Sequence, residues 1–147
     1  RKKCLGFGVD ISKKAIKLAK YNAKIQHIKN RIKFLNSDID NFYGGKYDLI
    51  ISNPPYVKLH KINSLDRDIK SFEPKVALNG GVDGYAKIRL TIKKSSTLIK
   101  RKGKLFLEVG FDQTRETLKI LKLNGFYTNK IVKDLANINR CLVSTKI

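Results

Sequence analysis

A short apolar run that ends in a rigid polar motif constrains the fold of this chain more than any other feature of its sequence. Residues 47–52 read Tyr-Asp-Leu-Ile-Ile-Ser, and Asn53-Pro54-Pro55-Tyr56 follows directly. A nearly continuous apolar run is typical of a strand buried on both faces of a parallel sheet. We therefore expect an α/β sheet in which this Asn-Pro-Pro-Tyr motif follows a buried strand.

Strands and helices alternate along the rest of the chain. The predicted strands cover residues 5–10, 32–35, 47–52, 104–109, 126–132 and 141–145, and the predicted helices cover 13–28, 84–100 and a segment between 112 and 124. Ser12 and Asp112 are expected to cap the first and last of these helices, and Asn124-Gly125 to end the last one. Residues 58–83 lack periodicity and are expected to form a substrate-facing loop. This order favours one α/β domain with a mostly parallel sheet and an antiparallel terminal pair of strands.

Composition excludes several classes of protein. No apolar stretch approaches the roughly 18 residues needed to cross a bilayer. The basic N-terminal tripeptide leads into a run broken by glycines and an aspartate, which is unlike a signal peptide. Cys4 and Cys141 are too few for a disulfide framework or a set of four metal ligands, and we expect both in the core. We predict a cytoplasmic protein without a metal, with His27 and His60 on surface or loop positions.

The net charge of the chain is strongly positive. It carries 32 basic and 12 acidic side chains, for a formal charge of +20. Such a charge attracts phosphate-rich or acidic partners at long range. The lysines are spread along the whole chain among many isoleucines and asparagines, however, and no aromatic and basic motif of a nucleic-acid module interrupts them. Compositional drift therefore explains the charge better than a nucleic-acid surface does.

Three polar side chains are expected at the carboxyl ends of strands, where ligands gather in open parallel sheets. They are Asp10, Asp38 and Asn53, and one ligand could contact all three. Asp10 suits the two hydroxyls of a ribose, and Asp38 could accept a hydrogen bond from an adenine amino group. Either aspartate alone would be better explained as a turn or cap residue. Their joint placement favours a nucleotide-like ligand.

The Asn-Pro-Pro-Tyr motif suits chemistry on a planar nitrogen. An amide nitrogen is a poor nucleophile, so a catalyst must accept both N–H protons and aim the lone pair. Proline fixes φ, lacks an N–H group and biases the preceding residue to extended geometry. The Asn53 side-chain oxygen and the Pro54 carbonyl would then form two fixed acceptors for one NH₂ group, and Tyr56 could lie against the amide plane. The alternative is a Pro-Pro turn with a capping asparagine, which the preceding buried strand disfavours.

Further segments extend this pattern from about Gly8 to the end of the chain. They are Leu49-Ile50-Ile51-Ser52 before the motif, Phe72-Glu73-Pro74, Ala77-Leu78, Gly80-Gly81-Val82-Asp83-Gly84, and Leu107-Glu108-Val109-Gly110 with Gln113. The pattern resembles the HemK/PrmC methyltransferases. That family methylates the side-chain amide of the glutamine in the Gly-Gly-Gln loop of peptide chain release factors, so the segment from Glu73 to Gly84 is expected to shape the glutamine-side loop.

The resemblance implies a Rossmann-like class I fold that uses S-adenosyl-L-methionine. It implies that Asn53 and Pro54 bind the glutamine amide, with Pro55 and Tyr56 completing the substrate site. Asp10 and Asp38 would hold the ribose and adenine of the cofactor, with Asn53 close by. A release factor would be the partner of a monomeric enzyme, without a role for membrane or nucleic acid.

The chain departs from the family upstream of Asp10. Such enzymes carry a helical substrate-binding domain, a first strand and a Gly-rich cofactor loop before the matching residue, and Gly6-Phe7-Gly8 cannot be that loop because it precedes Asp10 within one strand. We expect residues 1–147 to be part of a catalytic domain that binds cofactor weakly or not at all alone. In the family's sheet the first strand is central, so its absence would expose two apolar edges.

Three other functions fit part of the sequence. A glutamine methyltransferase acting on a ribosomal protein shares the same motif core. A nucleic-acid adenine aminomethyltransferase uses a similar motif on an exocyclic NH₂ group and would suit the charge, but only residues 56–84 are available as a target-recognition region. An inactive fragment that acts as a binding module would explain the missing Gly-rich loop.

Overall fold

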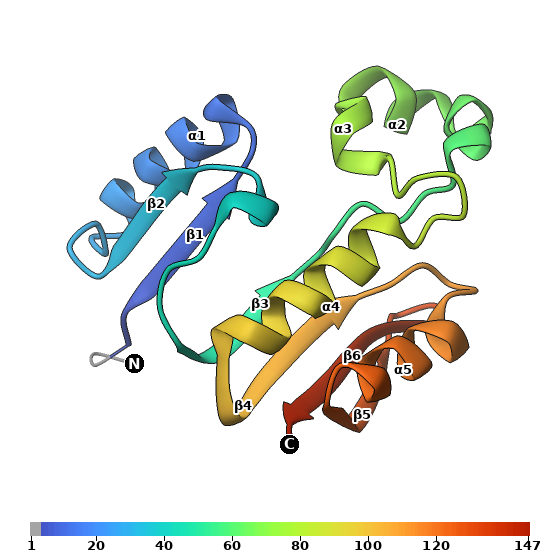
Figure 1. Ribbon diagram of the computed structural model, residues 1–147. Helices are drawn as coiled ribbons and strands as arrows, with labels where there is room; N and C mark the ends of the chain where they lie inside the picture. The colour runs from blue at the N-terminus through green and yellow to red at the C-terminus, as the bar shows by residue number, and fades with distance from the viewer. Residues whose placement is uncertain (1–3) are drawn as a thin grey trace. The chain divides into compact units, whose positions relative to one another are not determined.

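The computed structural model describes residues 4–147, and the chain divides into two compact units, one ending at Tyr43 and one covering Gly44–Ile147 (Figure 1). The first unit contains β1 (Gly6–Asp10), α1 (Lys13–Ile25), β2 (Ile32–Asn36) and the 3₁₀ turn η1 (Ile39–Asn41). The remaining elements belong to the second unit. The alternation of strands and helices predicted from the sequence is confirmed.

In the first unit, one helix packs on a two-stranded parallel sheet. The Ser12 hydroxyl accepts a hydrogen bond from the backbone N–H of Ala15 at 3.2 Å, which confirms the predicted cap of α1. Ile16 and Ala23 lie seven residues apart on α1 and are its buried side chains. β1 pairs in parallel with β2, and Asp10 lies opposite Asn36. Both strands therefore end at the same edge of this sheet.

The second unit is built on a four-stranded mixed sheet in the order β3-β4-β6-β5. Its strands are β3 (Tyr47–Ser52), β4 (Ile99–Glu108), β5 (Phe126–Lys133) and β6 (Asn139–Lys146). β3 and β4 are parallel, whereas β6 runs antiparallel to both of its neighbours. α4 (Ala86–Leu98) contacts β3 and β4, and α5 (Thr114–Leu123) contacts β5 and β6 (Figure 1). The expected antiparallel strand at the end of the chain is confirmed.

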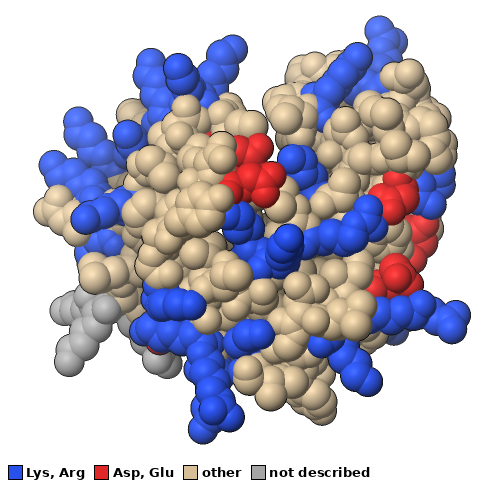
Figure 2. Space-filling model, in the orientation of Figure 1, with Lys and Arg blue, Asp and Glu red and all other residues tan. Residues whose placement is uncertain are grey.

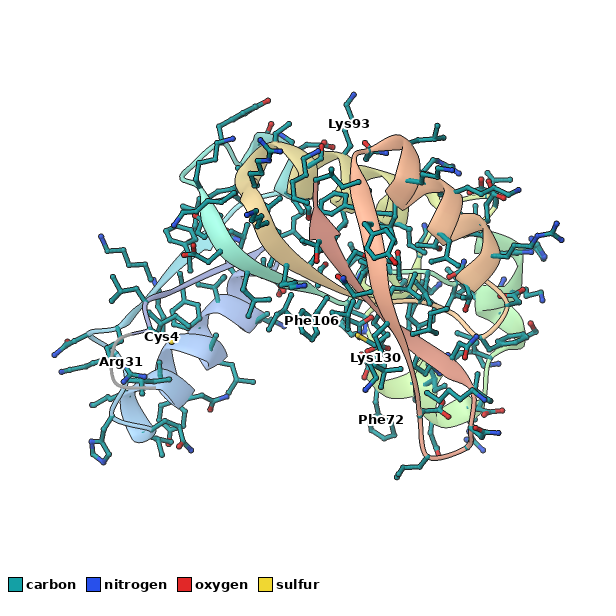
Figure 3. The ribbon with its side chains drawn as sticks, turned by 90° about the horizontal axis from the view of Figure 1, so that it is seen from below. Cys4, Arg31, Phe72, Lys93, Phe106 and Lys130 are labelled. Atoms are coloured by element: carbon teal, nitrogen blue, oxygen red, sulfur yellow. The ribbon has the colours of Figure 1, made fainter. Side chains whose placement is uncertain are left out.

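The main hydrophobic core lies between these helices and the sheet. Its buried members come from both helices, three strands and the turn after β4: Ile88, Ile92, Ile99, Leu105, Leu107, Val109, Leu121, Phe126 and Leu142. Alternation along β4 buries Leu105 and Leu107, while Phe106 between them points to the other face of the sheet (Figure 3). The charged side chain of Lys93 points away from α4 into solvent (Figure 3). The core formed by α4, α5 and the sheet thus supports the backbone of β3 and of the residues that follow it.

The prediction that β3 is buried on both faces is wrong. Leu49 is 48% exposed and Ile51 is 74% exposed, while Ile50 between them packs against the core. Side chains alternate between the two faces of a strand, so Leu49 and Ile51 point away from the face that α4 covers. A nearly continuous apolar run does not by itself tell a strand with two covered faces from a strand with one.

The loop expected at residues 58–83 contains short helices. They are the 3₁₀ helix η2 (Leu59–Ser64), α2 (Arg67–Phe72) and α3 (Lys75–Leu78). Each has at most six residues, and Ile62 is the one side chain within them that is buried. Helices this short cannot show an amphipathic period, so no helix was predicted here. The segment remains a surface connection, as expected.

Two further expectations about single residues are wrong. Asp112 does not cap α5, because Gln113 occupies the position before the first helical residue and Asp112 is exposed one residue earlier. Cys4 is exposed rather than in the core, and Cys141 is half-buried. His27 and His60 are exposed, as predicted, and Gly125 ends α5 with φ of 75°. Among residues 4–147, no helix combines the length and the apolar character that a membrane span requires.

Candidate functional site

The Asn-Pro-Pro-Tyr motif leaves the carboxyl end of β3 with its acceptor groups free. Pro54 is buried, whereas the Asn53 side chain is exposed. Neither the Asn53 amide nor the Pro54 carbonyl is hydrogen-bonded to another group in the described part of the chain. Both proline peptide bonds are trans. The two acceptors predicted from the sequence are therefore present on a fixed backbone and available to a ligand.

Tyr56 closes the motif and reaches back to the sheet. Its hydroxyl donates a hydrogen bond to Oε1 of Glu108 at 3.4 Å. Burial raises the pKa of the Tyr56 phenol, and the negative charge of Glu108 adds to the rise. The ring therefore stays neutral in ordinary buffers. Glu108, the last residue of β4, thus holds the phenol of Tyr56 against the sheet.

A second segment of backbone runs beside the motif and holds its far end. The N–H of Val57 donates to the carbonyl of Leu78 at 2.9 Å, and the N–H of Gly80 donates to the carbonyl of Val57 at 2.8 Å. A Cβ atom on Gly80 would lie 2.8 Å from the backbone of Tyr56, so only glycine permits this approach. The segment after α3, which the sequence grouped with the motif, is in direct contact with it.

A cavity of about 640 Å³ lies beside the motif. Its walls come from the motif, from the short helices, from the turn after β4 and from β6. The lining residues are Asn53, Pro54, Pro55, Tyr56, Val57, Lys58, Lys61, Leu65, Ile69, Glu73, Ala77, Leu78, Gly110, Phe111, Asp112, Gln113 and Arg140. This cavity is large enough for an extended peptide segment of a few residues. Residues 58–78 thus line the space next to the motif, as a substrate-facing loop should.

Both apolar and charged side chains surround this cavity. Phe111 lines it and is 65% exposed, whereas Phe72, at the end of α2, is 83% exposed and does not line it (Figure 3). Arg140 lines it from β6 and donates from Nε to Oδ2 of Asp134 at 2.9 Å. No role was predicted for Arg140, because it lies outside every motif of the sequence. Arg140 adds a positive charge to the lining of the cavity, which also contains Glu73.

Asp10 and Asp38 belong to the first unit: Asp10 is the last residue of β1, whereas Asp38 lies two residues after the end of β2 and caps η1. Oδ1 of Asp10 accepts from the N–H of Ser12 at 2.7 Å, and Oδ1 of Asp38 accepts from the N–H of Asp40 at 3.1 Å. Each carboxylate thus makes the turn contact that the simpler interpretation predicted. The second oxygen of each is hydrogen-bonded to no other described group. Each aspartate therefore keeps an acceptor for the hydroxyl or amino group of a ligand.

The basic side chains on the face shown in Figure 2 do not gather in one patch. Lysine and arginine side chains are spread over the visible face of the molecule, with acidic side chains few among them (Figure 2). Within residues 4–147, no group of three or more histidine, cysteine, aspartate or glutamate side chains is arranged to hold a metal ion. The described part of the site thus provides hydrogen-bond acceptors, a neutral phenol and a cavity lined by both apolar and charged side chains.

The known proteins that resemble this chain in sequence include methyltransferases. The family description "Methyltransferase small domain" matches residues 5–70. The chain is 40% identical over 95% of its length to a release factor glutamine methyltransferase of Thermodesulfovibrio yellowstonii, and 33% identical over 97% to one of Rhodospirillum rubrum. It covers 50% and 44% of these two proteins, so it spans about half the length of the curated relatives it matches.

A solved structure shows the fold. A methyltransferase from Pyrococcus furiosus superposes with a TM-score of 0.69 at 14% identity, over 97% of this chain and 63% of that one. The fold is therefore the Rossmann-like α/β fold of class I methyltransferases, with the mixed sheet described above. At this identity the likeness concerns the fold alone.

Proposed function

This chain belongs by sequence to the release factor glutamine methyltransferase family, and from that premise we propose that its protein methylates the side-chain amide of a glutamine. The proposed substrate is the glutamine of the Gly-Gly-Gln motif in a peptide chain release factor. Release factors act at the ribosome, so the reaction would take place in the cytoplasm. The observation that carries the proposal is the pair of unpaired acceptors at Asn53 and Pro54, which open beside a cavity of about 640 Å³.

The two acceptors fit a primary amide. An NH₂ group has two protons in one plane, and the Asn53 oxygen and the Pro54 carbonyl can each accept one of them. Binding both protons turns the nitrogen lone pair out of the plane of the acceptors and toward the methyl donor. The motif backbone is fixed by two prolines and by the contacts of Val57, so little ordering remains to be done when the substrate binds.

The phenol of Tyr56 has a positioning part in this proposal. It is half-buried and held by Glu108, and it stays neutral because its pKa is raised. A neutral ring can pack against the flat face of an amide and exclude water without competing for its protons. No general base is required before attack, because the amide nitrogen becomes acidic once it is alkylated.

The family implies S-adenosyl-L-methionine as cofactor, and Asp10 and Asp38 fit its polar groups. Asp10 is the last residue of β1, Asp38 lies two residues after β2, and each keeps one carboxylate oxygen outside its turn contact. Asp10 would accept from the ribose hydroxyls, and Asp38 would accept from the adenine amino group. Bound there, the cofactor supplies a methyl group on a positively charged sulfur.

Transfer of a labelled methyl group from the cofactor tests the proposal. The full-length protein is given a release factor, the same factor with its Gly-Gly-Gln glutamine replaced, and a mixture of ribosomal proteins. We expect label in the normal factor alone. Equal label in the substituted factor would contradict the proposal, and label in a ribosomal protein alone would favour the related glutamine methyltransferase.

One observation favours a second candidate, methylation of the adenine amino group in nucleic acid. The formal charge of +20 would draw DNA or RNA to the molecule. The spread of basic side chains in Figure 2 supports general attraction rather than a recognition surface on that face. Adding DNA and RNA to the same assay separates the candidates, since label in nucleic acid and none in the release factor would establish this second function instead.

A further inference from the structure

We infer that Gln113 is a positioning residue that holds the Asn-Pro-Pro-Tyr motif in its working geometry. Its side chain joins three backbone segments that are distant in the sequence: the end of the motif, the turn at Gly84 and the turn at Gly110. The inference rests on the proposed function for its effect on catalysis. Its structural part can be tested without any methyl transfer.

The hydrogen bonds of Gln113 use both ends of its amide. Nε2 donates to the carbonyl of Tyr56 at 3.1 Å and to the carbonyl of Gly84 at 3.0 Å. Oε1 accepts from the N–H of Gly110 at 2.9 Å. Both amide protons and one acceptor site are thus paired with backbone groups. Because the partners are two carbonyls and one N–H, they also fix which end of the amide is nitrogen.

Burial raises the free-energy cost of losing any of these hydrogen bonds. Gln113 is only 2% exposed, so water cannot replace a lost partner. Removing the amide would leave two carbonyls and one N–H unpaired in the interior, which costs more than an exposed hydrogen bond does. An apolar side chain of similar size would therefore fill the space without holding the segments together.

The glycines around Gln113 show how closely the segments pack. A Cβ atom on Gly84 would lie 2.9 Å from Nε2 of Gln113 and 2.9 Å from the Tyr56 carbonyl oxygen. A Cβ atom on Gly110 would lie 2.8 Å from Oε1 of Gln113. The turns at Gly84 and Gly110 thus lie so close to the Gln113 amide that a side chain at either glycine would clash with it. We call the meeting point of Gln113 with Tyr56, Gly84 and Gly110 the junction. The Gln113 amide contacts all three of the other residues.

The junction acts on the site through Tyr56. The Tyr56 carbonyl lies two residues after the Pro54 carbonyl, which is the proposed acceptor. Without the amide, the far end of the motif would keep the contacts of Val57 but lose its tie to the turn after β4. A misplacement of about 1 Å at a reacting group can lower a rate by about 100-fold. Gln113 should therefore affect turnover while the binding of cofactor, assigned to Asp10 and Asp38, stays unchanged.

Three variants separate this role from ordinary packing. Gln113→Leu keeps most of the volume and removes all three hydrogen bonds. Gln113→Glu keeps the acceptor for the Gly110 N–H but places a carboxylate oxygen against two carbonyls. Thr117→Val is the matched control, because Thr117 is buried in α5, which begins directly after Gln113, and its hydroxyl has no hydrogen-bond partner among the described residues.

Amide hydrogen exchange of the chain itself is the first test. In Gln113→Leu we expect exchange at Val57, Gly80 and Gly110 to be at least about tenfold faster than in the wild type. In Gln113→Glu the Gly110 amide should stay protected while the other two exchange faster. Unchanged amides of β4 and β6 show that each variant is folded. If these three amides behave in both Gln113 variants as they do in Thr117→Val, the inference is wrong.

Kinetics of the full-length protein are the second test. We expect kcat to fall about 10- to 100-fold in both Gln113 variants, with an unchanged KM for the cofactor and normal turnover in Thr117→Val. A wild-type protein without transfer to the release factor would overturn the proposed function and leave the exchange result standing. Faster exchange combined with full turnover would overturn the positioning role.

Discussion

Asn53 differs from the rest of its motif in having a side chain that is exposed and without a hydrogen-bond partner in the described chain. An asparagine amide in such a position contributes little to folding and is free to bind a ligand. Pro54 beside it is buried and holds the backbone. Pro54 therefore fixes the geometry of the motif, and Asn53 presents a polar group to a ligand.

Replacing Asn53 should remove turnover and spare stability. In Asn53→Ala we expect kcat to fall by about 100-fold or more, because one of two acceptors for the amide is lost. The affinity of the full-length protein for S-adenosyl-L-methionine, measured by calorimetry, should be nearly unchanged. Asn63→Ala is the control, since Asn63 is also exposed and lies in η2. A parallel loss of cofactor binding in Asn53→Ala would contradict its assignment to the substrate.

Tyr56 should titrate later than an ordinary tyrosine. Burial and the charge of Glu108 raise its pKa above the usual value of 10.0. The folded protein then holds the phenol proton more tightly than the unfolded chain does. The stability this provides is complete below pH 10 and is lost as the pH rises through the raised pKa. Turnover should accordingly show no downturn from Tyr56 between about pH 7 and pH 9.

The raised pKa of Tyr56 can be measured from the change in absorbance when tyrosines ionise. The difference between the titration curves of the wild type and Tyr56→Phe should isolate one phenol that ionises above pH 10. A difference curve centred below the ordinary tyrosine value would show that burial and Glu108 do not act as described.

Much of the site could be predicted at the level of single residues. The acceptors at Asn53 and Pro54 follow from the chemistry of an amide and the geometry of proline. The role of Gln113 could not be predicted in the same way, since its partners at Tyr56 and Gly84 are 57 and 29 residues away in the sequence. Arg140 was missed because one arginine on a strand carries no local signal.

Among the elements, the turn at Gly84 is important for the site because it contacts both Gln113 and the end of the Asn-Pro-Pro-Tyr motif. Gly84 has φ of 81° and lies against both Gln113 and the Tyr56 carbonyl. Gly45 has the same φ of 81°, but a Cβ atom there would meet only the movable end of the Tyr47 side chain at 3.1 Å. The two glycines share one backbone requirement and differ in their surroundings.

Alanine at the two glycines should therefore have unequal effects. Gly45→Ala should lower the free energy of unfolding by about 1 kcal/mol, from backbone strain alone. Gly84→Ala should lower it by about 1–3 kcal/mol more, because the added methyl group meets a backbone oxygen and a buried amide. Urea unfolding monitored by circular dichroism measures both. Equal losses would mean that the junction around Gln113 is looser than the distances indicate.

The strands and long helices were predictable, and the short helices were not. β3 was predicted at its observed bounds, because its apolar run lies between a glycine pair and two prolines. α2 and α3 have six and four residues, too few for a period to appear. The exposure of Leu49 and Ile51 also lay outside the reach of the sequence, since it depends on which face α4 covers.

At the scale of the whole chain, the two units differ in how firmly they are built. The buried apolar side chains of the first unit are Ile16, Ala23 and Phe42, each 4–8% exposed, while the second unit contains a core with many members at 0%. The first unit depends on one helix packed on two strands, whereas the second packs two helices on four strands and buries more apolar side chains. We expect the amides of β1 and β2 to exchange at least about 100-fold faster than those of β4 and β6. Equal protection in the two sheets would contradict this difference.

The central claim is that residues 53–56 direct methyl transfer to a glutamine amide. Its most direct test is mass spectrometry of a release factor after incubation with the full-length protein and S-adenosyl-L-methionine. The account predicts one added methyl group, located by fragmentation on the glutamine of the Gly-Gly-Gln motif, and none when Asn53→Ala replaces the wild type. A methyl group on any other residue, or the same modification by Asn53→Ala, would contradict it.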